Sequence, residues 1–515
     1  MGDIFYSNNK QELSVAVVGG GISGSTVAIK LAKHKINVSL FEASDSLVNG
    51  PPFCHLHAGG NLYREISDVA CVTLLKESIE IIKMYPNTIS ARPTLIIVPI
   101  HDYGEPNDLL PRLRVVQSAY ASLVDENPQN ELLGLPCDYF KTFSKEHIKK
   151  LRHFENPLNP VTFEEWLIPV TKHLNFKKIK FPVIMVQEYG WCTLRLAANV
   201  QLIIKNLKNC HVHLKSKVTD VKLIENQWHI QYRTNNPLTL EHETRFKKVD
   251  YLINACGYQT GFIDDLIQLN CKEMTELLTC KRMIEFKASY LCQWKECSGN
   301  WPGVVIHGER GTPNGMIQLT PYPGKLFQLH GMTQDITLFK DGLALSTNTS
   351  FQPKFSKKIN KMLSLSWEKD EVEKRTDAAI QYAAQYILGF LTATHAGPAL
   401  FGAQQIPGSD PNLRTGGVRF VGNNYIIIEI VKALSATSAS TKVLKHIYDN
   451  LKKKDGSFEE NGKNLFDNEA ETNLDITPSS NEITDLAIFL ANSRGYPNEL
   501  AKMINAYKLN LNCSC

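Results

Sequence analysis

The sequence predicts a mixed α/β protein organised around a strand–helix–strand unit near its start. An apolar run at residues 15–18 leads into a glycine-rich turn, and a second apolar run at residues 37–41 ends at Glu42. The turn holds the three glycines of a G-x-G-x-x-G pattern, Gly19, Gly21 and Gly24. A strand, this pattern, a helix and a terminal acid are together typical of a Rossmann-like domain that binds a dinucleotide. The simpler alternative is a glycine-rich turn in an unrelated α/β unit.

The residues of this unit have distinct expected roles. Gly19 makes the tight turn, Gly21 lets a pyrophosphate approach the backbone, and Gly24 lets the helix pack closely on its strand. The first turn of the helix, which contains Ser23, offers N–H groups and a positive dipole end to the phosphates. Glu42 stands where such folds accept ribose hydroxyls. Because an acid there disfavours a 2′-phosphate, FAD or NAD is expected rather than NADP.

Length and composition indicate a soluble globular protein with more than one domain. The 515 residues are enough for two or more hydrophobic cores, and 43% of them are hydrophobic. A net charge of +4 is small for this length, so no nucleic-acid partner is expected. The polar N-terminus lacks the apolar core of a signal peptide, and no apolar run is long enough to span a bilayer. We therefore expect a cytoplasmic protein whose 12 scattered cysteines are reduced.

Basic residues gather in two places, at 145–152 and at 177–180. One interpretation is a solvated face of ordinary surface lysines. The other is peripheral contact with the anionic inner face of a membrane. The sequence leaves both interpretations open.

The loop that follows Glu42 is rich in glycine and proline, and in a dinucleotide fold such a loop lies beside the cofactor. His55 and His57 alternate in it, so an extended chain places both on one face. No third and fourth ligand lies nearby, so we expect no metal. The two histidines then have either a structural role in the loop or a role at a redox centre. We expect Ala58 and Gly59, which follow them, to contact the cofactor.

Residues 68–185 lack further glycine-rich phosphate signals, so we interpret them as part of an inserted substrate domain. Apolar spacing within them predicts helices over 68–85, 109–124 and 139–150 and a strand over 94–98.

The dinucleotide pattern then resumes. A helix is expected over 188–207, and a hairpin follows whose first strand carries Val218 beside the cofactor. An apolar strand over 249–254 then ends in Asn-Ala-Cys-Gly. We expect the backbone at Ala255 and Gly257 to approach the cofactor a second time. The alternative is an ordinary strand that ends in a turn.

The glycine motif and the Ile253-Asn-Ala-Cys-Gly257 strand end together resemble the flavoprotein family of glutathione-reductase-like fold that includes D-amino-acid oxidase. Residues 57–63 are similar to the loop that branches handling 2-hydroxy acids place beside the flavin. Four later segments resemble, in order, segments of malate:quinone oxidoreductases: 305–316, 394–397, 415–418 and 433–441. Residues 317–322 depart from those enzymes, because they replace a His-Leu-Asp type sequence and contain neither His nor Asp.

The resemblance implies FAD as the cofactor, bound by a Rossmann-like domain of the glutathione-reductase type. It also implies an α+β substrate domain, interleaved with the first and built on a mixed or antiparallel sheet. It implies further cofactor contacts at Gly397, Gly402 and Ser438. The implied boundaries are 1–67, 186–268 and 386–450 for the FAD-binding domain, and 68–185 and 269–385 for the substrate domain.

Flavin-dependent oxidation of a small acid needs a base for the hydroxyl or amine proton and a cation for the carboxylate. Histidine suits the first role, and the fork of arginine suits the second. We expect His57 or His330 as the base, and Arg310, with Arg414 second, as the carboxylate anchor. The alternatives are structural histidines and a surface arginine paired with Glu309.

The expected reaction is oxidation of a small 2-hydroxy-acid-like substrate by hydride transfer to flavin N5, with the electrons passed to a quinone or a similar acceptor. Because residues 317–322 differ from the malate enzymes, other hydroxy acids and amines stay open as substrates. One alternative is an amino-acid or amine oxidase of the same fold that uses oxygen. A second alternative is a non-catalytic flavin- or NAD-binding module.

The composition changes at residue 451. Residues 451–515 are expected to form a polar linker and then two short amphipathic helices, over 483–492 and 498–507. These helices pack back on the body, mediate dimerisation or rest on a membrane, and packing back is the simplest of the three. The sequence does not predict the oligomeric state.

Overall fold

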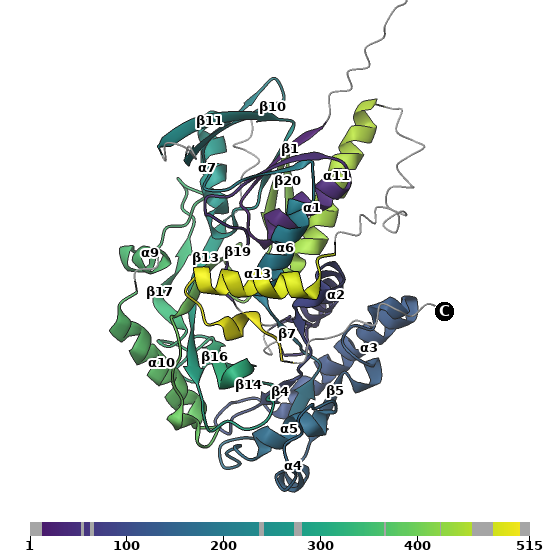
Figure 1. Ribbon diagram of the computed structural model, residues 1–515, viewed down its shortest axis with the longest axis vertical. Helices are drawn as coiled ribbons and strands as arrows, with labels where there is room; N and C mark the ends of the chain where they lie inside the picture. Colours follow the sequence, from purple (N-terminus) through teal and green to yellow (C-terminus); the bar gives the residue numbers. More distant parts are fainter. Residues whose placement is uncertain are drawn as a thin grey trace, which may run out of the picture.

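The structure is a computed structural model that describes residues 13–52, 56–61, 66–235, 241–271, 281–364, 367–422, 424–455 and 477–504. Within these residues, the strands form a six-stranded sheet, a ten-stranded sheet, a three-stranded sheet and a two-stranded sheet. In Figure 1 the six-stranded sheet lies in the upper half of the molecule and most of the ten-stranded sheet lies below it.

The six-stranded sheet consists of β1 (Ser14–Val18), β2 (Asn37–Phe41), β8 (Cys210–His213), β12 (Tyr251–Asn254), β20 (Gly417–Val421) and β21 (Tyr425–Glu429). Its order is β20-β21-β12-β1-β2-β8, and all neighbours are parallel except the edge strand β20. Helix α1 (Ile22–Lys33) connects β1 to β2, as predicted. A parallel sheet whose first two strands are joined by a helix is Rossmann-like, which confirms the predicted fold class.

Helices cover one face of this sheet, and a small antiparallel sheet covers the other. Val15 and Val17 of β1 share a hydrophobic core with α1 and with five further helices. Those are α2 (Asp68–Met84), α3 (Leu110–Glu126), α6 (Thr193–Lys205), α11 (Ala436–Asp455) and α13 (Ser480–Ser493). Ala16 and Val18 face the other way, because neighbouring residues of a strand point to opposite faces. They pack against β9 (Lys217–Ile224), β10 (Gln227–Asn235), β11 (His242–Val249) and α7 (Thr260–Asn270).

The ten-stranded sheet is mixed. Its main path is β17 (Leu338–Leu345), β13 (Arg282–Gln293), β16 (Leu326–Gly331), β15 (Ile317–Tyr322), β14 (Gly303–Ile306), β4 (Thr94–Ile97), β6 (Val183–Val186) and β5 (Phe140–Phe143). β18 (Thr394–His395) and β19 (Leu400–Pro407) also pair with β13. Its outer face is covered by α4 (Lys145–Leu151), α5 (Phe163–Thr171), α9 (Lys357–Leu363) and α10 (Lys369–Ala384).

Short elements complete the fold. β3 (Ile89–Ser90) and β7 (Gly190–Trp191) form the two-stranded sheet. The 3-10 helices are η1 (Pro86–Thr88), η2 (Pro106–Leu109), η3 (Pro128–Asn130), η4 (Pro136–Asp138), η5 (Gly257–Gln259), η6 (Pro323–Lys325), η7 (Phe390–Thr392), η8 (Ala433–Ser435) and η10 (Asn498–Ala501). In the part of the chain that the structure describes, no helix combines the length and apolar character needed to cross a membrane.

Three local predictions differ from the structure. The helix expected over 139–150 is replaced by β5 and α4, because β5 pairs with β6 at a sheet edge and the Ser144 side chain caps α4. The helix expected from residue 188 begins only at Thr193, since β7 precedes it. Residues 394–395 and 400–407, assigned with the rest of 386–450 to the dinucleotide-binding domain, instead pair along β13 in the ten-stranded sheet.

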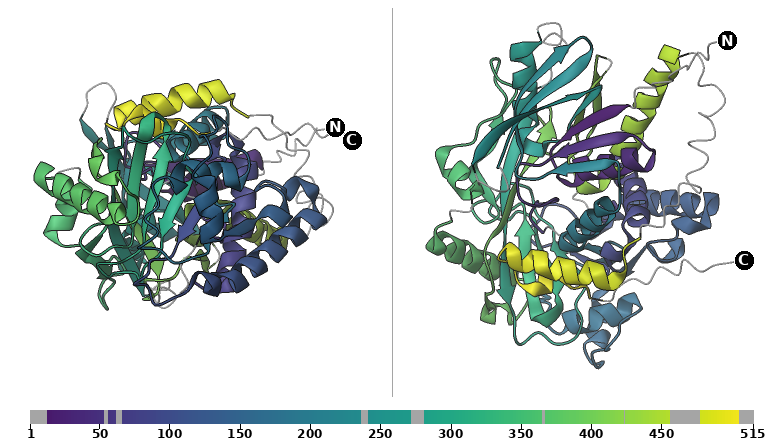
Figure 2. Two further views of the ribbon diagram at one scale, coloured as in Figure 1. Left: turned by 90° about the horizontal axis from the view of Figure 1, so that it is seen from below. Right: turned by 45° about the horizontal axis from the view of Figure 1, so that its top comes forward.

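The end of the described chain packs on the body. α13 lies against α6, and Arg195 of α6 donates hydrogen bonds to the hydroxyls of Thr484 (2.7 Å) and Ser480 (3.3 Å). Both views of Figure 2 show the yellow helix α13 on the outside of the molecule. The second helix expected there is only the short turn η10, and residues beyond 504 lie outside the described part.

Candidate functional site

The glycine-rich turn has the geometry of a phosphate cradle. Gly19 has φ +102°, and a Cβ there would lie 2.5 Å from the carbonyl oxygen of Ala255. At Gly24 a Cβ would lie 1.9 Å from the carbonyl oxygen of Gly19, so α1 packs directly on the turn. At Gly21, by contrast, no described atom lies within 4 Å of the Cβ position. The turn is therefore open where α1 presents its first N–H groups.

Glu42 lies at the end of β2 and closes this cradle. Its Oε2 accepts a hydrogen bond from the N–H of Gly20 at 2.7 Å, and its Oε1 accepts one from the N–H of Ser44 at 2.7 Å. A carboxylate has about four lone-pair sites, so it can still accept hydroxyl donors. Val218 is buried in the same hydrophobic cluster as Phe41, beside the ends of the parallel strands.

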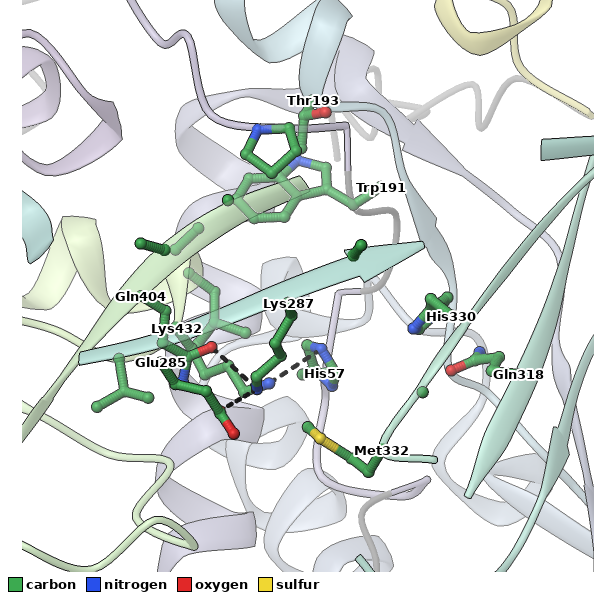
Figure 3. Close-up of a pocket in the computed structure, with 18 of the residues that line it drawn as sticks. His57, Trp191, Thr193, Glu285, Lys287, Gln318, His330, Met332, Gln404 and Lys432 are labelled. Atoms are coloured by element: carbon green, nitrogen blue, oxygen red, sulfur yellow. Dashed lines mark hydrogen bonds and ion pairs between the residues drawn. The ribbon is translucent and has the colours of Figure 1, made fainter. Parts of the chain in front are cut away.

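A cavity of about 280 Å³ lies where the parallel sheet meets the mixed sheet (Figure 3). Its walls come from the loop after β2, the start of α6, strands β13, β15, β16 and β19, and the segment that precedes α11. The lining residues are Pro51, His57, Asn61, Trp191, Thr193, Glu285, Lys287, Ala288, Met316, Gln318, His330, Gly331, Met332, Gly402, Ala403, Gln404, Val431, Lys432, Ala433 and Leu434.

Strand alternation explains which side chains reach the cavity. On β16, Leu329 packs into the outer core of the mixed sheet, so its neighbour His330 faces the other way. On β15 the cross-strand partner of His330 is Gln318, which also lines the cavity. On β13, Phe286 lies in the outer core, whereas Lys287 lines the cavity. Apolar side chains of these strands thus face the outer core, and the polar side chains that alternate with them form the wall of the cavity.

Four basic side chains converge on the cavity: His57, Lys287, His330 and Lys432. Nζ of Lys432 lies 3.3 Å from Nε2 of His57, and Nζ of Lys287 lies 2.7 Å from Oε2 of Glu285 (Figure 3). Burial is the main cause that lowers the pKa of all four, to about 8 for Lys287 and to about 3 for His330. Neighbouring positive charges lower these pKa values further. An anion in the cavity would oppose that repulsion, so the site suits an anionic ligand.

His57 stands on a loop that is wrapped around Glu188. His57 has a left-handed backbone, with φ +56°, and the carboxylate of Glu188 is fully buried beside it. Burial raises the pKa of Glu188 to about 7, although the hydrogen bonds it accepts act in the opposite direction. Those bonds come from the N–H groups of Ala58 (3.0 Å), Gly60 (2.6 Å) and Asn61 (3.3 Å).

Glu188, Lys287 and Lys432 are site residues that the sequence does not predict. Glu188 follows a strand of the mixed sheet, Lys287 lies within another, and Lys432 follows a strand of the parallel sheet. A single charged residue at such a place has no local pattern that distinguishes it from surface charge. The one pattern that could have predicted such a residue is the alternation along β13, which places Lys287 on the opposite face of the sheet from its apolar neighbours.

Three polar atoms at the cavity are buried and have no hydrogen-bond partner among the described residues. They are Oδ1 of Asn61, Oγ1 of Thr193 and Nε2 of Gln404. A buried polar atom of this kind costs about 1–3 kcal/mol unless a ligand or a water satisfies it. The cavity therefore offers both acceptors and a donor to a bound molecule.

The structure brings some of the predicted site residues together. His57, His330 and Gly402 line the cavity. Ala58 and Gly59 follow His57; Gly59 has φ +97°, and a Cβ there would lie 2.6 Å from the carbonyl oxygen of Cys71. The turn with Gly19, Gly21, Ser23 and Gly24 lies instead at the start of α1, with Ala255 packed against Gly19 and Gly257 following β12. His55 lies outside the described residues.

Other predicted residues lie away from the cavity. Arg310 forms an ion pair with Glu285 and donates to the carbonyl oxygen of Pro411 at 2.9 Å, in a surface pocket on the far side of Glu285. It therefore balances the charge of Glu285, and not that of Glu309 as in the simpler alternative. Arg414 is buried and does not line the cavity, but its charge lowers the pKa of Lys432.

Two residues expected at the cofactor have other neighbours. A Cβ at Gly397 would contact Leu291 at 3.0 Å and Pro497 at 3.3 Å, and neither of these residues lines the cavity. The hydroxyl of Ser438 donates to Oε1 of Glu77 at 2.6 Å, so this side chain is directed toward α2.

The fold and the cavity together define the class of protein: a Rossmann-like, dinucleotide-binding α/β protein with a second, mixed sheet. Residues 17–48 match a family model described as "NAD(P)-binding Rossmann-like domain". No curated protein matches the sequence.

Several solved structures are similar in fold. L-proline dehydrogenase from P. horikoshii is 14% identical, with a TM-score of 0.52, and the match covers 85% of this chain and 94% of that chain. L-amino acid deaminase from Proteus vulgaris is 10% identical, with a TM-score of 0.51 and the same coverage, 85% and 94%. Glycine oxidase from Geobacillus kaustophilus is 11% identical, with a TM-score of 0.50 and coverage of 84% and 94%. At these identities the similarity establishes the shared fold.

Proposed function

We propose that the protein is an FAD-dependent oxidoreductase that oxidises a small, carboxylate-bearing substrate of the 2-hydroxy-acid type. The observation that carries this proposal is the cavity at the junction of the two sheets, with its four basic side chains. The names of the three structures similar in fold, a dehydrogenase, a deaminase and an oxidase, are in line with redox chemistry on small acids.

The residues present fit FAD at two places. The open Cβ position of Gly21 suits a pyrophosphate, and Glu42 suits ribose hydroxyls. At the other end, the cavity wall formed by Ala433 and Leu434 leads into α11, whose positive dipole end favours negative charge on a flavin ring. When bound, FAD accepts a hydride from a substrate C–H bond, which is the chemistry that this chain cannot supply itself.

The side chains of the cavity have separate proposed tasks. Lys287 holds the substrate carboxylate, because its ammonium group lies in the wall and is only partly balanced by Glu285. His57 takes the substrate proton, because burial and Lys432 keep its pKa well below the usual value and so leave a neutral nitrogen available. His330, whose pKa is lowered to about 3, is uncharged and orients the substrate together with Gln318.

The FAD-binding domain comprises 1–67, 186–268 and 386–450 apart from β18 and β19, and the substrate domain comprises 68–185 and 269–385 together with β18 and β19. The electrons pass to a quinone or a similar acceptor, and the protein works in the cytoplasm with peripheral contact to a membrane.

A second candidate is an amino-acid or amine oxidase that reduces oxygen. The three structures similar in fold favour it, because their names describe action on proline, glycine and L-amino acids. The same cavity suits it, since an amino acid also carries a carboxylate.

The test is anaerobic reduction of the purified protein. We expect a yellow protein with flavin absorption, bleached by one or more members of a panel of 2-hydroxy acids and reoxidised by a soluble quinone. Bleaching by amino acids only, with peroxide released in air, would favour the second candidate. A protein that contains no flavin and retains none after incubation with FAD would contradict both candidates.

A further inference from the structure

Exposed apolar side chains gather in the loop 152–162, which joins α4 to α5. Of the large apolar side chains that the structure describes, Leu158 and Val161 are the most exposed, at 88% and 83%, and Phe154 in the same loop is 59% exposed. Single exposed apolar residues are common on soluble proteins. Three within one short loop indicate an interaction surface.

The loop is fixed in place, so this exposure is part of the folded structure. The side chain of Asn300 donates to the carbonyl oxygen of Leu158 at 2.8 Å, which ties the tip of the loop to the segment after β13. The side chain of Asn156 donates to the hydroxyl of Ser298 at 2.9 Å. The carboxylate of Glu165 accepts from the N–H of Val161 at 2.7 Å. The backbone is thus held while the apolar side chains project into solvent.

Basic side chains surround this loop. Arg152 at its start donates to the carbonyl oxygen of Lys172 at 3.2 Å and lies 5.1 Å from the ring centroid of Phe176, so the segment 172–178 is its neighbour. Helix α4, the loop and the segment 172–178 together expose six basic residues and two acidic ones, Glu146 and Glu155. The basic residues are Lys145, Lys149, Lys150, Arg152, Lys177 and Lys178. Lys180 is turned away, toward Glu105 at 2.6 Å.

We propose that loop 152–162, with the basic residues of α4 and of the segment 172–178, is a docking surface for an anionic lipid bilayer. Apolar side chains at a loop tip enter the boundary between headgroups and acyl chains, and each nearby Lys or Arg adds about 1 kcal/mol of attraction to anionic headgroups. Figure 1 shows α4 and α5 at one end of the molecule, opposite β10 and β11. The inference is independent of the proposed redox activity, because none of these residues lines the cavity.

The test is cosedimentation of the full-length protein, as purified, with vesicles. Vesicles of phosphatidylcholine alone are compared with vesicles that also contain phosphatidylglycerol. We expect binding to the anionic vesicles only, with a bound fraction that falls as salt is added. Leu158→Ser with Val161→Ser, and separately Lys149→Glu with Lys150→Glu, should each weaken binding about tenfold or more, which is about 1.4 kcal/mol.

Two matched controls separate this surface from general effects. Val69→Ser changes an apolar residue of similar exposure, 77%, at the start of α2, and Lys442→Glu with Lys445→Glu changes exposed lysines of α11. Both controls should bind like the unchanged protein. Absence of binding to anionic vesicles would overturn the proposal, as would an equal loss in the controls. A concentration-dependent dimer that Leu158→Ser dissolves, without vesicle binding, would assign the surface to self-association and would also overturn it.

Discussion

Nζ of Lys432 lies 3.3 Å from Nε2 of His57, and the two residues reach the cavity from different loops of the parallel sheet. Two basic groups this close cannot both be protonated in a buried site without a strong penalty. Burial is the main cause that holds the pKa of each well below its usual value; the charge of Lys432 lowers that of His57 further, and the charges of Arg414 and Lys287 lower that of Lys432. The pair is therefore poised to gain a proton when a negative charge enters the cavity.

Replacing Lys432 should weaken the binding of small carboxylates. For Lys432→Met we expect the dissociation constant of a non-reactive carboxylate to rise roughly 10- to 100-fold, since a hydrogen bond to a charged group contributes about 1.5–3 kcal/mol. The measurement is a titration followed by the absorption spectrum of the protein. Lys442→Met, an exposed lysine of α11, is the control and should leave the constant unchanged. Equal affinities in the two variants would exclude Lys432 from the ligand site.

Lys287 should take up a proton when an anion binds. Its pKa is lowered to about 8 by burial, so at pH 8 about half of the amines are neutral. A bound carboxylate raises that pKa, and we expect uptake of up to about half a proton per ligand. Calorimetry in two buffers of different ionisation enthalpy measures this uptake. The uptake should fall in Lys287→Met to the part contributed by the Lys432–His57 pair, and it should be unchanged in Lys340→Met, which changes an exposed lysine of β17.

Glu188 should make the stability of the protein depend on pH. Its folded pKa, about 7, is raised from 4.5 by burial. The stabilisation linked to this raised pKa is complete below about pH 4.5 and is lost as the pH rises through 7. Relative to Glu188→Gln, the unchanged protein should lose up to about 3 kcal/mol of unfolding free energy between pH 5 and 8.

The measurement for Glu188 is urea unfolding of both proteins at several pH values. Glu126→Gln, an exposed acid at the end of α3, should follow the unchanged protein at every pH. A constant difference between the unchanged protein and Glu188→Gln across this range would show that the carboxylate is ionised throughout.

Gly21→Val should abolish FAD retention without unfolding the protein. No described atom other than those of its chain neighbours lies within 4 Å of the Cβ position, so the added side chain begins in open space and occupies the space proposed for the pyrophosphate. The flavin-to-protein ratio after gel filtration measures this loss. Lys340→Val, at an exposed position of β17, is the control and should retain FAD. Full FAD occupancy in Gly21→Val would contradict the proposed site.

Arg494 should hold the loop that follows β2. Its guanidinium donates to the carbonyl oxygens of Val48 at 3.1 Å and Leu47 at 3.1 Å. Leu47 in turn covers Gly20, whose Cβ would lie 2.6 Å from Leu47 Cδ2. Arg494→Ala should speed amide hydrogen exchange in residues 44–52, because it removes about 1–3 kcal/mol of hydrogen bonding. Arg494→Lys should keep part of the protection, and unchanged exchange in Arg494→Ala would show that the loop is held by other contacts.

Much of the frame could be predicted from the sequence, because its signals are local. The glycine-rich turn is predicted by Gly19, Gly21 and Gly24 and by the apolar runs on either side of them. This pattern is local, because the turn depends on contacts between residues that are close together along the chain. The same holds for Glu42 at the end of β2, and for His330 in a strand of the second sheet. The predicted helix at 139–150 was wrong, because pairing between β5 and β6 overrides the local pattern.

The sequence by itself determined that a strand, a glycine turn and an acid form a dinucleotide cradle, since those residues are close together along the chain. Only the tertiary structure decided which charges share a site. Arg310 pairs with Glu285, 25 residues away, and Glu188 holds a loop whose donors, from Ala58 to Asn61, are 127 to 130 residues away. A charge acts across space with little dependence on sequence distance, so its partner, its burial and its pKa are properties of the folded chain.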